Sequence, residues 1–80
     1  MNNTDMINKA VEVVAQAINA DNAEEYEKAL GLYRDALSRF TMGLKYEKNP
    51  ARKELIIQRV DGYMKRAEEL RDYVNKQNEL

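Results

Sequence analysis

The stretch Tyr26–Leu44, YEKALGLYRDALSRFTMGL, decides the fold of this 80-residue chain. Its aromatic residues recur every seven positions, and leucines recur with the same period between them. The alternation of four- and three-residue steps places all of them on one face of an α-helix. The members of this stripe are Tyr26, Leu30, Tyr33, Leu37, Phe40 and Leu44. The pattern predicts a long amphipathic helix that other helices must cover.

Similar stripes on both sides of this stretch predict two further helices. We expect the three helices over about residues 5–20, 23–47 and 50–76. The stripe of the first helix consists of Ile7, Val11, Val14 and Ile18. The stripe of the third helix consists of Ile56, Val60, Tyr63, Ala67, Leu70 and Val74. Each stripe repeats at intervals of four and three residues, which is typical of a helix with one buried face.

Short polar breaks separate the predicted helices and supply their caps. Asn22 is the expected N-cap of the central helix, with Glu25 three residues later to complete a capping box. Asn49 is the expected N-cap of the third helix, and Pro50 its first residue, where a missing N–H costs nothing. Because the breaks are too short for a crossover, neighbouring helices should be antiparallel. We therefore predict one all-α domain over residues 1–80, an antiparallel three-helix bundle with spectrin-like or tetratricopeptide-like packing.

The composition excludes several classes of function. Thirteen basic and 14 acidic residues give a net charge of −1, without the basic excess typical of nucleic-acid binding. Histidine and cysteine are both absent, which removes the commonest general base and the commonest zinc ligands. No apolar run approaches the roughly 20 residues of a membrane span, and the N-terminus does not resemble a signal peptide. We expect no catalysis, no cofactor, no metal and no membrane insertion, and a cytoplasmic location.

Apolar residues that remain outside the three stripes predict a surface for a partner. On the second and third helices they lie at helical spacing beside charged residues, as expected of a groove that a guest amphipathic helix completes. The alternative is that these residues form the edge of a wide core stripe, because single exposed apolar residues are normal. The predicted groove residues are Leu32, Ala36, Arg39, Gly43, Tyr46, Ile57, Asp61, Met64, Glu68 and Arg71.

Several segments of the chain resemble the MIT (microtubule-interacting and trafficking) domain family. They are NKAVEVVAQAINAD (8–21), DNAEEYEKALGLYRDAL (21–37), LKYEKNP (44–50) and YMKRAEELRDYV (63–74). The resemblance extends from Ile7 to about Lys76 and is strongest to the N-terminal MIT domains of vacuolar-protein-sorting AAA ATPases that disassemble ESCRT-III filaments.

The resemblance implies two grooves for C-terminal tails of ESCRT-III subunits. In type-1 recognition a Leu-rich helix lies between the second and third helices, and the central apolar contact falls on Met64, where leucine is commoner. The guest would bury leucines against Met64, Leu32 and Ala36, and its basic residue would pair with Glu68 or Asp61. In type-2 recognition an extended, proline-containing segment lies between the first and third helices. Its contacts fall on Ala10, Val14 and Ala17.

The function expected from this resemblance is that of an adaptor. A monomeric domain would bind ESCRT-III tails and recruit a hexameric AAA ATPase to endosomal membranes, for filament disassembly in endosomal sorting and membrane scission. ATP and Mg²⁺ would belong to the ATPase domain of the parent protein. The alternatives are the MIT domain of another trafficking protein and a tetratricopeptide-like scaffold or oligomerisation module. A carboxylate metal enzyme ranks last.

Overall fold

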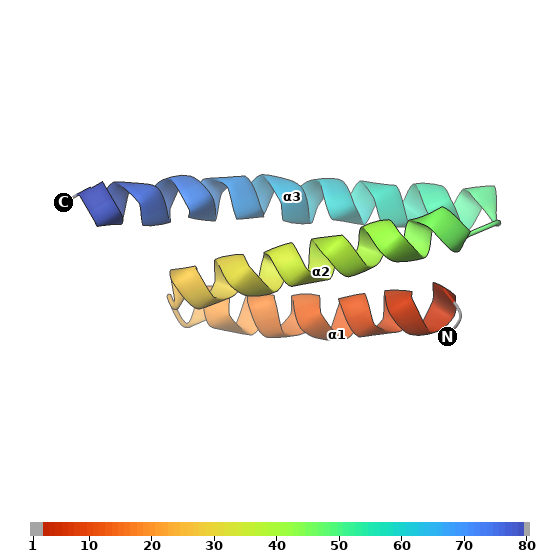
Figure 1. Ribbon diagram of the computed structural model, residues 1–80, viewed down its shortest axis with the longest axis horizontal. Helices are drawn as coiled ribbons and strands as arrows, with labels where there is room; N and C mark the ends of the chain where they lie inside the picture. The colour runs from red at the N-terminus through yellow and green to blue at the C-terminus, as the bar shows by residue number, and fades with distance from the viewer. Residues whose placement is uncertain (1–2, 80) are drawn as a thin grey trace.

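The computed structural model describes residues 3–79, which form three α-helices joined by two short turns. The helices are α1 (Asn3–Asn22), α2 (Tyr26–Tyr46) and α3 (Pro50–Glu79). Consecutive helices run antiparallel, and the C-terminal end of α3 projects beyond the turn between α1 and α2 (Figure 1). The predicted three-helix architecture is therefore confirmed. Within the described residues, no helix has both the length and the apolar character needed to cross a membrane.

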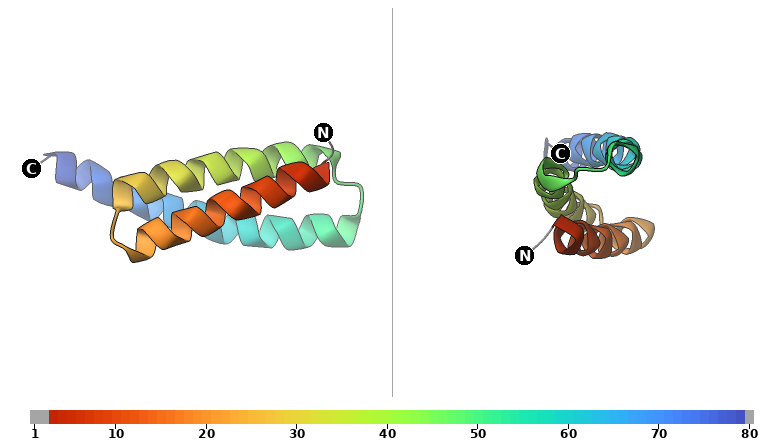
Figure 2. Two further views of the ribbon diagram at one scale, coloured as in Figure 1. Left: turned by 90° about the horizontal axis from the view of Figure 1, so that it is seen from below. Right: turned by 90° about the vertical axis from the view of Figure 1, so that its right-hand side faces the viewer.

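The central element of the bundle is α2. Its backbone lies close to those of both other helices, whereas no Cα atom of α1 comes within 8 Å of one of α3 among the described residues. Seen end-on, the three helices form an arc with α2 at the bend (Figure 2). The bundle consequently has one open side, between α1 and α3, where only side chains connect the two helices.

The stripes predicted for α2 and α3 form the core between these helices. In each stripe three residues are buried and three are half-buried. Aromatic rings make the contact, because Tyr33 and Phe40 of α2 both stack with Tyr63 of α3, with ring centroids 6.4 and 5.9 Å apart. One end of the interface is closed by an edge-to-face pair, Tyr26 and Tyr73, with centroids 4.9 Å apart. Such pairs stabilise by about 0.5–1.5 kcal/mol beyond the burial of their surface.

The buried face of α1 differs from the predicted one. Val11 is 52% exposed and Ile18 is 39% exposed, although both belong to the predicted stripe. Three alanines, Ala10, Ala17 and Ala20, are buried instead. Because the separation of two packed helices depends on the side chains between them, alanines allow α1 to lie close to α2. The buried face of α1 combines these alanines with Ile7, Val13 and Val14, whereas Val11 and Ile18 at its margin face outward.

The turn between α1 and α2 closes with a Schellman motif instead of the predicted capping box. The amide N–H of Glu25 donates to the carbonyl oxygen of Ala20 at 2.9 Å, and that of Glu24 donates to Asp21 at 3.0 Å. Glu24 adopts the left-handed conformation, with φ 63°. Asn22 is the last residue of α1, and α2 begins after Glu25 without a side-chain cap. The predicted cap is wrong because α1 extends two residues further than its stripe indicates.

The turn between α2 and α3 agrees with the prediction. The side-chain Oδ1 of Asn49 accepts hydrogen bonds from the amides of Ala51 at 3.0 Å and Arg52 at 3.3 Å. Pro50 is the first residue of α3, as expected from its fixed φ and missing N–H. Asn49 therefore caps the N-terminus of α3.

Candidate partner-binding surfaces

One side of α3 presents apolar and acidic side chains together. Ile57 and Met64, seven residues apart, are 44% and 47% exposed. Asp61 and Glu68 lie on the same side, each four residues further along the helix. The carboxylate of Asp61 already contacts Nζ of Lys65 at 3.0 Å. Among the residues that the structure describes, Glu68 has no ion pair or hydrogen bond from its side chain, so its charge is available to a partner.

This side of α3 is turned away from α1. Arg66 reaches across to α1, and Met64 precedes it by two positions, which places the two side chains roughly 200° apart around the helix. Arg71, seven residues after Met64, shares the outer side, and its guanidinium pairs with the adjacent Asp72 at 3.3 Å. The structure thus brings the five predicted α3 residues together on one exposed side, while their part in binding stays a prediction.

The α2 residues predicted for the same groove lie on another side of the bundle. Leu32 lines a hollow together with residues of α1, among them Gln16 and Ala20. Arg39 lines a second hollow with residues of α1 that include Met6. Leu32 and Arg39 therefore face α1, and the structure does not bring them to the side chains of α3.

Ala36 and Gly43 belong to the same edge of α2. Both alternate with Leu32 and Arg39 at helical spacing, and both are buried, Ala36 with no exposed surface. A guest could not contact Ala36 without a rearrangement of the bundle. Tyr46, at the end of α2, is 60% exposed. The α2 half of the predicted groove is therefore wrong. A seven-residue repeat identifies the apolar face of a helix, but it does not show which neighbouring helix covers each edge of that face.

Two leucines supply the α2 edge that does lie toward the outer side of α3. Tyr33 and Phe40, which stack with Tyr63, mark the direction of α3. Leu37 and Leu44 are half-buried and lie beside this aromatic row, opposite to the edge that faces α1. Neither leucine was predicted at the surface, because the periodic stripe places both in the core. The available signal was that alanine and glycine gather on one edge of the stripe and leucine on the other.

The residues predicted to line the second groove, between α1 and α3, are not at the surface. Ala10, Val14 and Ala17 are 0%, 4% and 0% exposed, so all three belong to the core. The exposed apolar residues of α1 are Val11 and Ile18, seven residues apart and adjacent to Val14 on the helix surface. The open side of the bundle therefore presents these two side chains where the sequence predicted the alanines.

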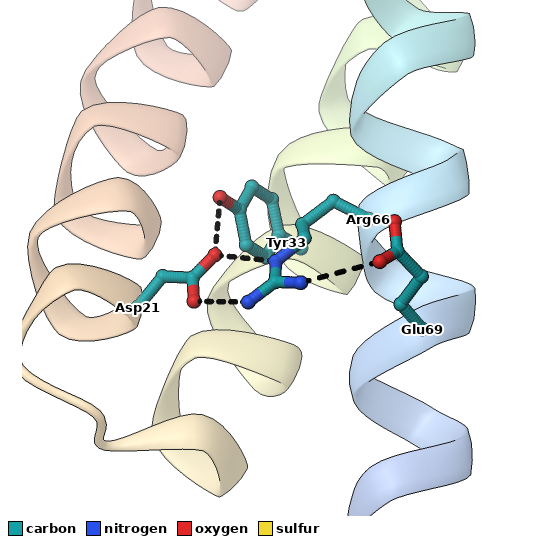
Figure 3. Close-up of polar contacts among 4 residues, drawn as sticks. All are labelled: Asp21, Tyr33, Arg66 and Glu69. Atoms are coloured by element: carbon teal, nitrogen blue, oxygen red, sulfur yellow. Dashed lines mark hydrogen bonds and ion pairs between the residues drawn. The ribbon is translucent and has the colours of Figure 1, made fainter.

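A polar cluster connects α1 and α3 across this open side (Figure 3). The guanidinium of Arg66 donates from Nε and Nη2 to the two carboxylate oxygens of Asp21, both at 2.7 Å. The hydroxyl of Tyr33 donates to Oδ2 of Asp21 at 3.2 Å. Glu69 contacts Nη1 of Arg66 at 3.4 Å. This cluster, which we call the Asp21–Arg66 clasp, joins all three helices.

The clasp changes the titration of its members. Hydrogen bonds from Arg66 lower the pKa of the Asp21 carboxyl, and they outweigh the opposing effect of burial. The same bonds raise the pKa of the Arg66 guanidinium. Burial is the main cause that raises the pKa of the Tyr33 hydroxyl, followed by the negative charge of Asp21. Asp21 and Arg66 are therefore both charged at neutral pH.

The exposed side chains described above suit the binding of a partner segment. Within residues 3–79, no group of three or more acidic, histidine or cysteine side chains is arranged to hold a metal ion. The clasp groups with shifted pKa values bond to one another, and Arg66 and Glu69 also line a hollow of about 290 Å³ beside Tyr26 and Tyr73. Exposed apolar residues beside charged ones are instead the ordinary means of binding a peptide segment.

Comparison with known proteins identifies the family to which this chain is similar. The MIT (microtubule interacting and transport) domain family matches residues 7–72. Protein SUPPRESSOR OF K(+) TRANSPORT GROWTH DEFECT 1 of Arabidopsis thaliana is 51% identical over 63 residues, 79% of this chain and 14% of the relative. Vacuolar protein sorting-associated protein 4 of Dictyostelium discoideum is 40% identical over 76 residues, 95% of this chain and 17% of the relative.

A relative of another kind matches too. Serine/threonine-protein kinase ULK3 of Homo sapiens is 38% identical over 73 residues, 91% of this chain and 16% of the kinase. The chain thus spans less than a fifth of the length of these relatives, and it matches one module that they share. The chain belongs to the MIT domain family, whose members are non-catalytic protein-interaction modules.

Proposed function

We propose that this MIT domain binds short C-terminal segments of ESCRT-III subunits and thereby recruits a AAA ATPase to ESCRT-III filaments on endosomal membranes. The similarity to Vacuolar protein sorting-associated protein 4 supports an ATPase parent of that kind. The ATPase activity, with its ATP and Mg²⁺, belongs to a part of the parent outside these 80 residues. The domain itself acts as a monomeric adaptor.

The observation that carries this proposal is the outer side of α3. Exposed Ile57 and Met64 offer an apolar contact for the leucines of a guest helix, and the half-buried Leu37 and Leu44 extend it onto α2. The carboxylate of Glu68, which has no partner among the described residues, is placed to pair with a basic residue of the guest. Such pairing sets the orientation of the guest more than its affinity.

The size of this surface predicts a weak individual interaction. A single guest helix on one face of a small domain buries less than about 1,200 Å², which is the lower end of protein interfaces. An affinity near micromolar, about −8 kcal/mol, is the expected result. If the parent assembles into a hexamer, several domains engage neighbouring tails of one filament, and multivalency makes the filament a far better ligand than a free subunit.

A peptide titration of the isotope-labelled domain tests the proposal. A synthetic type-1 ESCRT-III tail peptide should shift backbone amide resonances of the outer side of α3 and of Leu37 and Leu44. Met64→Asp should abolish this binding with little loss of stability, because the side chain is 47% exposed. Glu68→Lys should weaken it and should restore affinity for a peptide whose basic residue is replaced by glutamate. Absence of binding to the unmodified domain would reject the proposed partner.

A second recognition mode is favoured by the open side of the bundle. Val11 and Ile18 are exposed there, and the backbones of α1 and α3 stay apart. An extended, proline-containing type-2 segment would fit between the two helices. Ile18→Asp should reduce binding of a type-2 peptide and leave binding of the type-1 peptide unchanged. Met64→Asp should reduce binding of the type-1 peptide and leave binding of the type-2 peptide unchanged, and the two results together would show that the surfaces act independently.

A further inference from the structure

The largely apolar pocket between α1 and α2 is used by neither of these surfaces. It has a volume of about 490 Å³, within the range of about 300–1,000 Å³ typical of ligand pockets. It lies between the N-terminal part of α1 and the C-terminal part of α2. The lining residues are Asp5, Met6, Lys9, Ser38, Arg39 and Met42.

This pocket is remote from α3. None of its lining residues belongs to α3. On α2, Met42 and Arg39 lie on the side away from Tyr33 and Phe40, whose rings point to α3. A partner could therefore occupy the pocket while guests occupy the outer side of α3 or the open side of the bundle.

Two methionines give the pocket its apolar surface. Met6 comes from the α1 wall and Met42, which is 44% exposed, from the α2 wall. Methionine side chains are flexible and polarizable, so that they adapt to an inserted apolar group better than branched residues do. Tyr46, one helical turn beyond Met42, is 60% exposed and extends the apolar surface along α2. These residues suit a bulky aliphatic or aromatic side chain.

Cations on both walls give the pocket its charge preference. Lys9 stands on α1 and Arg39 on α2. Within the described part of the chain, each pairs with an acid of its own helix, Lys9 with Glu12 at 3.4 Å and Arg39 with Asp35 at 3.0 Å. All four side chains are more than 40% exposed, so these pairs are screened by water and bind weakly. A carboxylate placed between the two walls would meet cations of both helices at once.

We propose that this Met6–Met42 pocket is a third docking surface, which binds an acidic amphipathic segment of a partner protein. A bulky apolar side chain of the segment inserts between Met6 and Met42, and a neighbouring carboxylate binds between Lys9 and Arg39. This inference concerns a partner other than the one that binds the outer side of α3.

A designed peptide provides the test. The probe is a helix-forming peptide of about 12 residues, blocked at both ends, with one phenylalanine flanked by two glutamates. Its control carries lysines in place of the glutamates. Titrated into the labelled 80-residue chain, the acidic probe should shift amide resonances of residues 5–9 and 38–42 and leave those of 57–71 unchanged. The lysine control should bind at least about tenfold more weakly, which corresponds to one bound charge contact.

Matched variants separate this pocket from the surface on α3. Met42→Asp should weaken the acidic probe at least about tenfold, whereas Met64→Asp, at a residue of the same type and nearly equal exposure, should have no effect. Arg39→Glu should reverse the preference between the acidic probe and its lysine control. Circular dichroism confirms that each variant folds.

Three results would overturn the inference: equal binding of the two probes, shifts that map to α3, or binding that Met42→Asp leaves unchanged. The type-1 tail peptide provides the independent comparison. If it fails to bind while the acidic probe behaves as expected, the proposed ESCRT-III partner is rejected and the Met6–Met42 pocket stands.

Discussion

Asp21, near the C-terminal end of α1, and Arg66, in the middle of α3, form a bidentate ion pair with both hydrogen bonds at 2.7 Å. It spans the open side of the bundle, where the backbones of the two helices do not approach each other. The side chain of Asp21 is only 13% exposed, and the Tyr33 hydroxyl occupies one of its remaining acceptor sites. The clasp thus holds α1 to α3 by side chains alone.

The clasp should contribute measurably to stability. Asp21→Asn keeps the size of the side chain but removes its charge and one of the acceptors for Arg66. We expect a loss of about 1–2 kcal/mol in the free energy of unfolding, as for other charge-assisted hydrogen bonds that are partly shielded from water. Urea denaturation at neutral pH measures it. Asp35→Asn, which breaks an exposed pair with Arg39 on one helix, is the control and should cost no more than about 0.5 kcal/mol.

The stability should also depend on pH through Asp21. Its pKa is lowered by folding from an ordinary value of 3.8, so the unfolded chain binds the proton more readily. The contribution of the clasp is therefore fully present above about pH 4 and is lost as pH falls through the folded pKa. In urea titrations between pH 7 and pH 2, the difference between the unmodified chain and Asp21→Asn should shrink on acidification. A constant difference would show that the charge of Asp21 is not responsible.

Glycine at position 24 should stabilise the domain. Glu24 has φ 63°, a conformation that costs an L-residue about 1–2 kcal/mol and that glycine adopts freely. Part of the expected gain is lost, because glycine has more conformational entropy in the unfolded chain. Glu24→Gly should raise the free energy of unfolding by about 0.5–1 kcal/mol, visible as an increase of several degrees in Tm. Glu24→Ala is the control, because it removes the charge and keeps the strained backbone. An equal gain from both variants would point to charge and not to backbone conformation.

Two isoleucines of α1 should differ sharply in their effect. Ile7 is 5% exposed and belongs to the core, whereas Ile18 is 39% exposed. Ile7→Ala should cost about 2–4 kcal/mol through the cavity that it leaves, and Ile18→Ala less than about 1 kcal/mol. Thermal denaturation of both variants makes the comparison within one helix and one residue type. Equal losses would mean that Ile18 is buried as deeply as Ile7, as the periodic pattern of the sequence predicts.

Much of the fold could be read from periodicity and caps. The stripe from Tyr26 to Leu44 has the periodicity of a helix with one apolar face, and Asn49 followed by Pro50 combines a side-chain acceptor with a fixed φ at the start of α3. These features act within a few residues of one another, so their physical effect does not depend on the rest of the chain. The five outward residues of α3 were predictable for the same reason.

The candidate site could be predicted only in part. Val11 and Ile18 fit the periodic pattern as well as Ala10 and Ala17 do, and nothing local decides which set is buried. The choice depends on how closely α1 approaches α2, which is a property of both helices. Leu32 and Arg39 were predicted toward α3 but face α1 for the same reason. The apolar face of α2 is continuous, and the sequence does not show which part of it each of the two neighbouring helices covers.

The sequence by itself determined that this chain forms three helices, where α3 begins and which family it belongs to, because those properties reside in short-range patterns and motifs. Only the tertiary structure decided that alanines take the place of Val11 and Ile18 in the buried face of α1, that Glu24 has a left-handed backbone conformation, and that Asp21 contacts Arg66, 45 residues away. A helix shows all its faces along one sequence. Which face is buried against which neighbouring helix depends on the distance and angle at which helices far apart in the chain pack.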